Sequence, residues 1–108
     1  MTDKTIAPAA FAELWKNGQI EADAVIDVRE LHEWDYYHLA GTRHVPMNTI
    51  PGVWTTLPEE KQLYIICAHG VRSDRVCGWL RQQGVDRAVN VDGGMAAVAA
   101  YVDGFEYD

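Results

Sequence analysis

The sequence has few cysteines and no long apolar segment. Its 108 residues include two cysteines, Cys67 and Cys77, which are too few for the disulfide frameworks that stabilise small secreted domains. No stretch approaches the ~20 apolar residues that span a bilayer, and the N-terminal residues lack the apolar core of a signal peptide. These absences predict a cytoplasmic protein that binds no membrane and keeps its cysteines as thiols.

Basic residues are also scarce. Nine Lys and Arg residues face 16 Asp and Glu residues, which gives a formal net charge of −7. Nucleic acid is therefore excluded as an expected partner, because phosphate backbones select basic surfaces. The chain contains no internal repeat or low-complexity tract, and its length suits one domain with one continuous core.

Short apolar runs alternate with segments that have a helical period, and this pattern is typical of an α/β fold with a parallel sheet covered by helices on both faces. The expected strands are residues 5–6, 24–27, 43–46, 63–67 and 88–91. The expected helices are residues 8–17, 31–38, 71–83 and 93–102, and residues 48–57 are expected to be irregular or weakly helical.

The expected helix over residues 71–83 contains three residues that need an interpretation. Gly78 costs about 1 kcal/mol relative to Ala inside a helix, so we expect it to permit close packing against the sheet. Cys77 lies too far along the helix to reach Cys67 for a disulfide and is interpreted as a small buried hydrophobic residue. Arg75, near the start of the helix, is expected at the surface.

The stretch "CAHGVRS" directly follows the apolar run "LYII". A strand that ends at Cys67, followed by a short turn and a helix from about Val71, places the thiol at a helix N-terminus. Parallel sheets bind ligands at this edge, and the unpaired amides of the helix favour an anion there. Gly70 lets the turn bend so that several amides point inward. The stretch predicts a nucleophilic thiolate at Cys67, with Arg72 as a nearby positive charge and Ser73 as a local cap.

Four segments of the chain resemble the signatures of the rhodanese-like sulfurtransferases, in particular their small single-domain members. In chain order they read "VIDVRELHEW", "YHLAGTRHVP", "IICAHGVRS" and "VNVDGGMAA". The resemblance covers nearly the whole chain and implies a single rhodanese-like domain over residues 1–108. It also implies a five-stranded, mostly parallel sheet flanked by helices on both faces.

Carried over position by position, the resemblance makes Cys67 the catalytic residue that becomes a persulfide. The residues implied to bind the substrate are Ala68, His69, Gly70, Val71, Arg72 and Ser73. The implied enzyme is a thiosulfate sulfurtransferase, which moves a sulfane sulfur from a donor such as thiosulfate to cyanide or a thiol, including a thiol carried by a protein. Such covalent catalysis requires no metal or organic cofactor, and a thiolate held by amides needs no general base at His69.

Two alternatives stay open at this point. A thiol-dependent phosphatase or arsenate reductase would use a similar loop, and a non-catalytic interaction module would keep the fold without the chemistry. Cysteine phosphatases as a class need five residues between Cys and Arg, whereas four separate Cys67 from Arg72 here. The loop length therefore argues against the first alternative, and the presence of Cys67 argues against the second.

The polar residues of the first two signatures are interpreted as structural. Asp27, Arg29 and Glu33 are expected to form one structural cluster, with Arg29 and Glu33 at i, i+4. His38 and His44 are expected to be hydrogen-bonded, because no ligand spacing that would indicate a metal site accompanies them.

Overall fold

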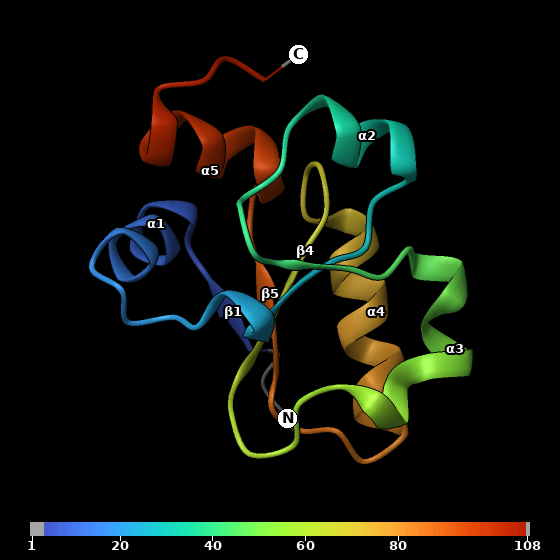
Figure 1. The fold of residues 1–108 in the computed structure, drawn as a ribbon. Coiled ribbons are helices and arrows are strands. Elements are labelled where there is room, and N and C mark those ends of the chain that lie inside the picture. The colour runs from blue at the N-terminus through green and yellow to red at the C-terminus, as the bar shows by residue number, and fades with distance from the viewer. Residues whose placement is uncertain (1–3, 108) are drawn as a thin grey trace.

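A five-stranded parallel sheet forms the centre of the molecule in the computed structural model, which describes residues 4–107 (Figure 1). The strands are β1 (Thr5–Ile6), β2 (Val25–Asp27), β3 (Arg43–His44), β4 (Leu63–Ile66) and β5 (Ala88–Val91). They lie in the order β1-β5-β4-β2-β3, and every neighbouring pair is parallel. The predicted α/β fold is confirmed, and the sheet is parallel throughout rather than mostly.

Helices cover both faces of this sheet, as expected. In Figure 1, α1 (Pro8–Lys16) and α5 (Gly94–Asp103) lie on one face, and α3 (Ile50–Val53) and α4 (Val71–Gln82) lie on the other. The short α2 (Leu31–Tyr36) lies beyond the carboxyl ends of the strands. The segment expected to be irregular or weakly helical contains α3 between two 3₁₀ turns.

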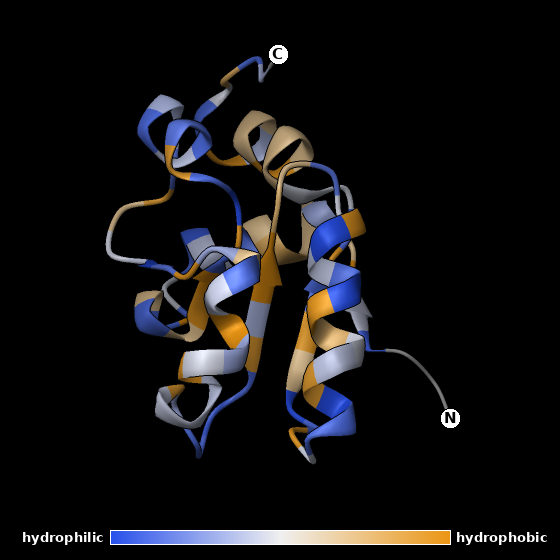
Figure 2. Ribbon diagram, turned by 90° about the vertical axis from the view of Figure 1, so that its right-hand side faces the viewer, coloured by the Kyte–Doolittle hydropathy of each residue, from blue (hydrophilic) through white to orange (hydrophobic). Residues whose placement is uncertain are grey.

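Each face of the sheet has its own apolar core. On the α4 face, buried residues of β2 and β4 pack with the inner side of α4, and Ile50 and Leu57 complete the cluster. On the other face, Phe11 of α1 and Met95 and Val98 of α5 pack against the sheet. In Figure 2 the strands are mostly orange, and the helices nearest the viewer carry blue and white segments beside orange ones. No helix within residues 4–107 is long and apolar enough to cross a membrane.

The strand register determines which residues meet at the carboxyl edge of the sheet. Asp27, the last residue of β2, is the partner of Ile66, the last residue of β4. Ile65 of β4 is in turn the partner of Asn90 of β5. Cys67 therefore leaves the sheet between two strands whose polar residues lie one register position apart, at the edge where open parallel sheets place their sites.

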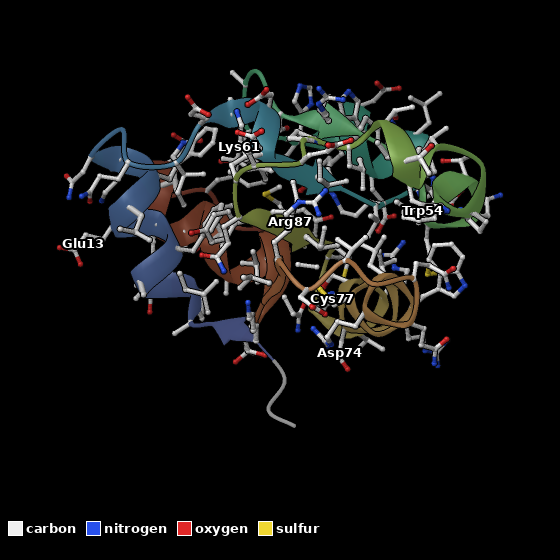
Figure 3. The ribbon with its side chains drawn as sticks, turned by 90° about the horizontal axis from the view of Figure 1, so that it is seen from below. Glu13, Trp54, Lys61, Asp74, Cys77 and Arg87 are labelled. Carbon is white, nitrogen blue, oxygen red and sulfur yellow. The ribbon has the colours of Figure 1, made fainter. Side chains whose placement is uncertain are left out.

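Cys77 lies on the inner side of α4, whereas Asp74 lies on its outer side (Figure 3). The Cys77 side chain is fully buried within the core on the α4 face, which confirms its interpretation as a buried hydrophobic residue. Both cysteines are thiols.

The expectation that Gly78 permits close packing is wrong. A Cβ added at Gly78 would meet no heavy atom within 4 Å, because the residue lies on a partly exposed side of α4 and not against the sheet. The helix thus carries the cost of a glycine at this position without a compensating contact.

We expect Gly78→Ala to stabilise the protein by about 0.5–1 kcal/mol, because alanine restricts the unfolded chain and fits the open space. The free energy of unfolding from urea titrations measures this change. Gly84→Ala is the matched control: its added Cβ would also meet nothing within 4 Å, but Gly84 has a φ of +91°. That control should lose about 1 kcal/mol from backbone strain alone. A loss of stability in Gly78→Ala would contradict the open-space interpretation.

Candidate active site

The thiol of Cys67 lies immediately after β4, inside a tight turn that leads into α4. Its Sγ accepts hydrogen bonds from the backbone N–H of Gly70, at 3.1 Å, and of Ser73, at 3.3 Å. The turn closes because Gly70, the residue before α4, has a φ of +93°, a conformation that L side chains disfavour. The start of α4 thus directs two N–H donors at one sulfur atom, an arrangement that stabilises a negative charge there.

The carbonyl groups of this turn are held away by the start of α5. The N–H of Met95 donates to the Cys67 carbonyl at 2.7 Å, and the N–H of Ala96 donates to the Ala68 carbonyl at 3.0 Å. This contact needs Gly94, because a Cβ there would lie 2.5 Å from the Cys67 carbonyl oxygen. The free amides at the start of α5 therefore orient the turn, and those at the start of α4 face the sulfur.

Ser73 has a different role from the expected helix cap. Its side chain makes no cap at the start of α4 and is fully buried. The Ser73 hydroxyl donates its single proton to Oδ1 of Asn90 at 2.5 Å, and its oxygen lies 3.2 Å from Cys67 Sγ. Asn90 also donates from Nδ2 to the Gly70 carbonyl at 3.4 Å. Ser73 and Asn90 thus connect the sulfur to β5.

Arg72 is held by a carboxylate and is not an isolated positive charge. Its Nη1 and Nη2 donate to the two oxygens of Glu33, each at 2.8 Å. These hydrogen bonds lower the pKa of Glu33 from 4.5 to about 2 and raise that of Arg72. Arg29 and Glu33 are in contact, as expected, but through the backbone: Arg29 Nη1 donates to the Glu33 carbonyl at 3.2 Å. Arg29 precedes α2, so its side chain does not pair with the Glu33 carboxylate as two helical residues would.

The other half of that expected cluster is present. The Arg29 side chain is fully buried and binds Asp27 with two hydrogen bonds, from Nε at 2.9 Å and from Nη2 at 2.8 Å. Its Nη2 also donates to the Tyr37 carbonyl at 2.6 Å, and its Nη1 donates to the Tyr107 hydroxyl at 2.9 Å. A buried charge is stable only with such partners. The hydrogen bonds of Arg29 therefore connect α2 and the C-terminal segment to the end of β2.

A pocket of about 640 Å³ lies next to the turn. It is lined by His32, Glu33, Tyr36, Ala68, His69, Arg72 and Tyr107. Three of the residues expected to bind substrate, Ala68, His69 and Arg72, thus share one wall. Val71 does not line this pocket, because its side chain is 62% exposed and borders a separate hollow beside Asp74. Arg75 is at the surface, as expected.

The two histidines of the second signature are hydrogen-bonded, as expected. Nδ1 of His38 bonds to the Trp34 carbonyl and Nε2 of His44 to the Arg29 carbonyl, both at 2.8 Å. Both rings stack with Trp34. Over residues 4–107, no three His, Cys, Asp or Glu side chains gather as metal ligands would.

Comparison with known sequences shows where this site belongs. The rhodanese-like domain family matches residues 8–101. The chain belongs to the rhodanese-like family. The match includes strands β2 to β5 and the Cys67 turn, so the resemblance of the four signatures is confirmed.

Individual relatives agree with this assignment. "Putative sulfurtransferase YtwF" of Bacillus subtilis is 40% identical over 100 residues, which cover 90% of this chain and 91% of the relative. "Thiosulfate sulfurtransferase GlpE" of Stutzerimonas stutzeri is 27% identical over 94 residues, which cover 87% and 84% of the two chains. The structure of SSP1007 from Staphylococcus saprophyticus has a TM-score of 0.78 and 32% identity, and it covers 96% of this chain and 99% of that one.

Three features of this rhodanese-like site were not expected from the sequence. Asn90 had a usable signal, because it is a polar residue within the apolar run "AVNV". The pairing of Glu33 with Arg72 had none, since 39 positions separate the two residues. Tyr107 had none either: it lies beyond the residues that match the family and reaches the pocket only through the fold.

We expect Glu33→Gln to lower the free energy of unfolding at pH 7 by on the order of 1 kcal/mol, because the ion pair is partly exposed and solvent weakens it. The carboxylate has a lowered pKa in the folded protein, so its contribution is complete above pH 4.5 and declines as the pH falls towards about 2. Urea titrations between pH 7 and pH 3 should show the two proteins converging in acid. Asp35→Asn, an exposed acidic residue of α2, is the control and should follow the wild type. A constant difference across this range would contradict the ion-pair explanation.

Proposed function

We propose that this chain is a sulfurtransferase that carries a sulfane sulfur on Cys67 as a persulfide. The Cys67 thiolate attacks the outer sulfur of a donor such as thiosulfate, the sulfur–sulfur bond of the donor breaks, and sulfite leaves with the electron pair. A thiophilic acceptor, cyanide or a thiol, then attacks the outer sulfur of the persulfide, and the Cys67 thiolate returns. The covalent intermediate divides one difficult transfer into two displacements.

The observation that carries the proposal is the pair of N–H groups, from Gly70 and Ser73, that point at Cys67 Sγ. Such donors are placed before the reaction starts, so they stabilise the sulfur anion without reorganisation. They serve the thiolate that attacks in the first step and leaves in the second. Cys67 is only 1% exposed, and we propose that a donor approaches it from the pocket that Ala68 and His69 line. Membership of the rhodanese-like family agrees with this chemistry.

The phosphatase alternative fits this turn less well. A tetrahedral phosphate needs enough amides to surround three oxygens, together with an arginine that is free to bind two of them. The turn has one residue fewer than the cysteine phosphatases have as a class, and both terminal nitrogens of Arg72 bind Glu33. Ser73 occupies the position at which the longer motif has its arginine.

Incubation with thiosulfate should add the mass of one sulfur atom to Cys67, and cyanide should remove it with release of thiocyanate. Mass spectrometry of the intact protein and of its peptides measures both steps. Steady-state rates should follow ping-pong kinetics, because the first product leaves before the acceptor binds.

The two cysteines provide the matched controls for this experiment. Cys67→Ala should abolish both the mass change and thiocyanate formation, while Cys77→Ala should retain most of the activity because Cys77 lies in the core on the α4 face. Turnover that survives in Cys67→Ala would overturn the assignment. A native protein that takes no sulfur from any donor would favour the interaction module instead.

The same protein should hydrolyse aryl phosphates at a negligible rate under conditions in which it produces thiocyanate. A spectrophotometric assay with an aryl phosphate substrate, run beside the thiosulfate:cyanide assay, compares the two rates. If both activities were similar in size and both disappeared in Cys67→Ala, the phosphatase function would take precedence.

A further inference from the structure

The pocket beside Cys67 presents two opposite charges side by side. Among the residues that line it, Glu33 carries a full negative charge and Arg72 a full positive one, and their side chains remain 19% and 29% exposed. The pair is therefore reachable from the pocket. Neither charge is available to neutralise a ligand, because the two residues already neutralise each other.

This pairing makes the pocket unfavourable for a ligand that carries only negative charge. An anion that approaches Arg72 also approaches the Glu33 carboxylate, about 3 Å away. If the anion displaced Glu33, it would leave a largely buried carboxylate without its main partner, which is costly. Thiosulfate is a dianion without a positive group, so its binding beside Arg72 carries this free-energy cost.

A ligand with both charges avoids the penalty. Arg72 has five N–H groups, and two of them bind Glu33. The Glu33 carboxylate has about four acceptor positions. Arg72 takes two of them and the N–H of Glu30 takes another, so one position remains for a ligand. A carboxylate can thus bind the remaining N–H groups of Arg72 while an ammonium group binds Glu33, and the ion pair stays intact.

The aromatic residues of the pocket fit the same ligand. The rings of Tyr36 and Tyr107 lie 5.5 Å apart, edge to face, and both line the pocket. Tyrosine rings attract ammonium groups through their electron-rich faces. The volume of about 640 Å³ is in the range of small-molecule sites, so it holds an amino acid or a short peptide rather than a folded protein surface.

We propose that the sulfur acceptor of this site is a small zwitterionic thiol, of the amino acid or short peptide class, recognised by the Glu33–Arg72 pair. The inference rests on the proposed function. In the step itself, the acceptor thiol first loses its proton to solvent, and its thiolate attacks the outer sulfur of the Cys67 persulfide. A new sulfur–sulfur bond forms on the acceptor, and the bond to Cys67 breaks. The electron pair remains on Cys67 Sγ, and the acceptor leaves as its persulfide.

Four small thiols test this recognition: cysteine with both charges, cysteamine with the ammonium alone, 3-mercaptopropionate with the carboxylate alone, and 2-mercaptoethanol with neither. A Cys77→Ala protein is first loaded on Cys67 with inorganic polysulfide, which persulfidates a thiol whether or not thiosulfate is a donor. Mass spectrometry then follows the loss of the sulfur, and each rate is divided by the thiolate fraction of the acceptor. Cysteine should react about tenfold faster than each of the other three, the factor expected from one added charge-assisted contact.

Substitution of Glu33 tests the cause of this order. Glu33→Gln keeps the shape but removes the negative charge, so 3-mercaptopropionate should react as fast as cysteine or faster, and cysteamine should become slower. Asp35→Asn is the matched control: it removes the same charge from the same helix, but Asp35 does not line the pocket, and the order should stay that of the wild type.

Equal corrected rates for the four thiols in the protein with wild-type Glu33 would overturn the inference, and this result needs no further variant. An order that is unchanged in folded Glu33→Gln would overturn it as well. Failure of the proposed function has a different signature: thiosulfate would leave no sulfur on Cys67 and no thiocyanate would form with cyanide, although chemical loading of Cys67 with polysulfide succeeds.

Discussion

The site depends on the contact between the start of α5 and the turn that follows β4. Two N–H groups of α5 hold the carbonyls of Cys67 and Ala68, and only a glycine at position 94 allows this approach. Because a peptide group that fixes its carbonyl on one side also fixes the direction of its N–H, the turn has little freedom to collapse onto the sulfur. The N–H groups of Gly70 and Ser73 then face Cys67 Sγ. Two helices that are distant in the chain thus cooperate, one to orient the turn and the other to bind the charge.

A protein with a net charge of −7 repels small anions at long range, so the sulfur anion of the proposed reaction would have to be stabilised locally. Arg72 contributes little free charge, because Glu33 neutralises it. In the proposed reaction, backbone amides would supply most of the stabilisation, over a distance at which salt screening is weak. The Glu33–Arg72 pair would then serve, as we propose, to recognise the rest of the ligand. Under both proposals, the groups that stabilise the reacting sulfur are different from the groups that select the molecule which carries it.

Much of this architecture was predictable from the sequence. Apolar runs marked the strands, and the strand that ends at Cys67 fixed the place of the thiol, because the carboxyl ends of parallel strands meet at one edge. The turn at Gly70 was predictable because glycine readily adopts the backbone conformation that a tight turn requires. What remained hidden depends on side chains that meet through tertiary structure: Glu33 with Arg72, and Tyr107 with the pocket. No local rule connects residues so far apart in the chain, and the match to the family ends at residue 101.

The errors have a common physical origin. The expected contact of Arg29 with Glu33 applied a helical spacing across the start of α2, where the chain is still extended. The Arg29 side chain therefore binds the Asp27 carboxylate and the Glu33 carbonyl, and not the Glu33 carboxylate. The interpretation of Gly78 assumed that a glycine in a helix faces a neighbour, whereas it faces open space. In both cases the residue type was correctly recognised and its direction was not. The direction of a side chain depends on where its helix begins and on which side of the helix meets the sheet. An error of one residue in the position along a helix changes the direction of the side chain by about 100°. Asn90 shows the opposite case: alternation along a strand is coarse, so a polar residue in a buried strand at the carboxyl edge has few places to point, and here it points to Ser73, beside the reacting sulfur.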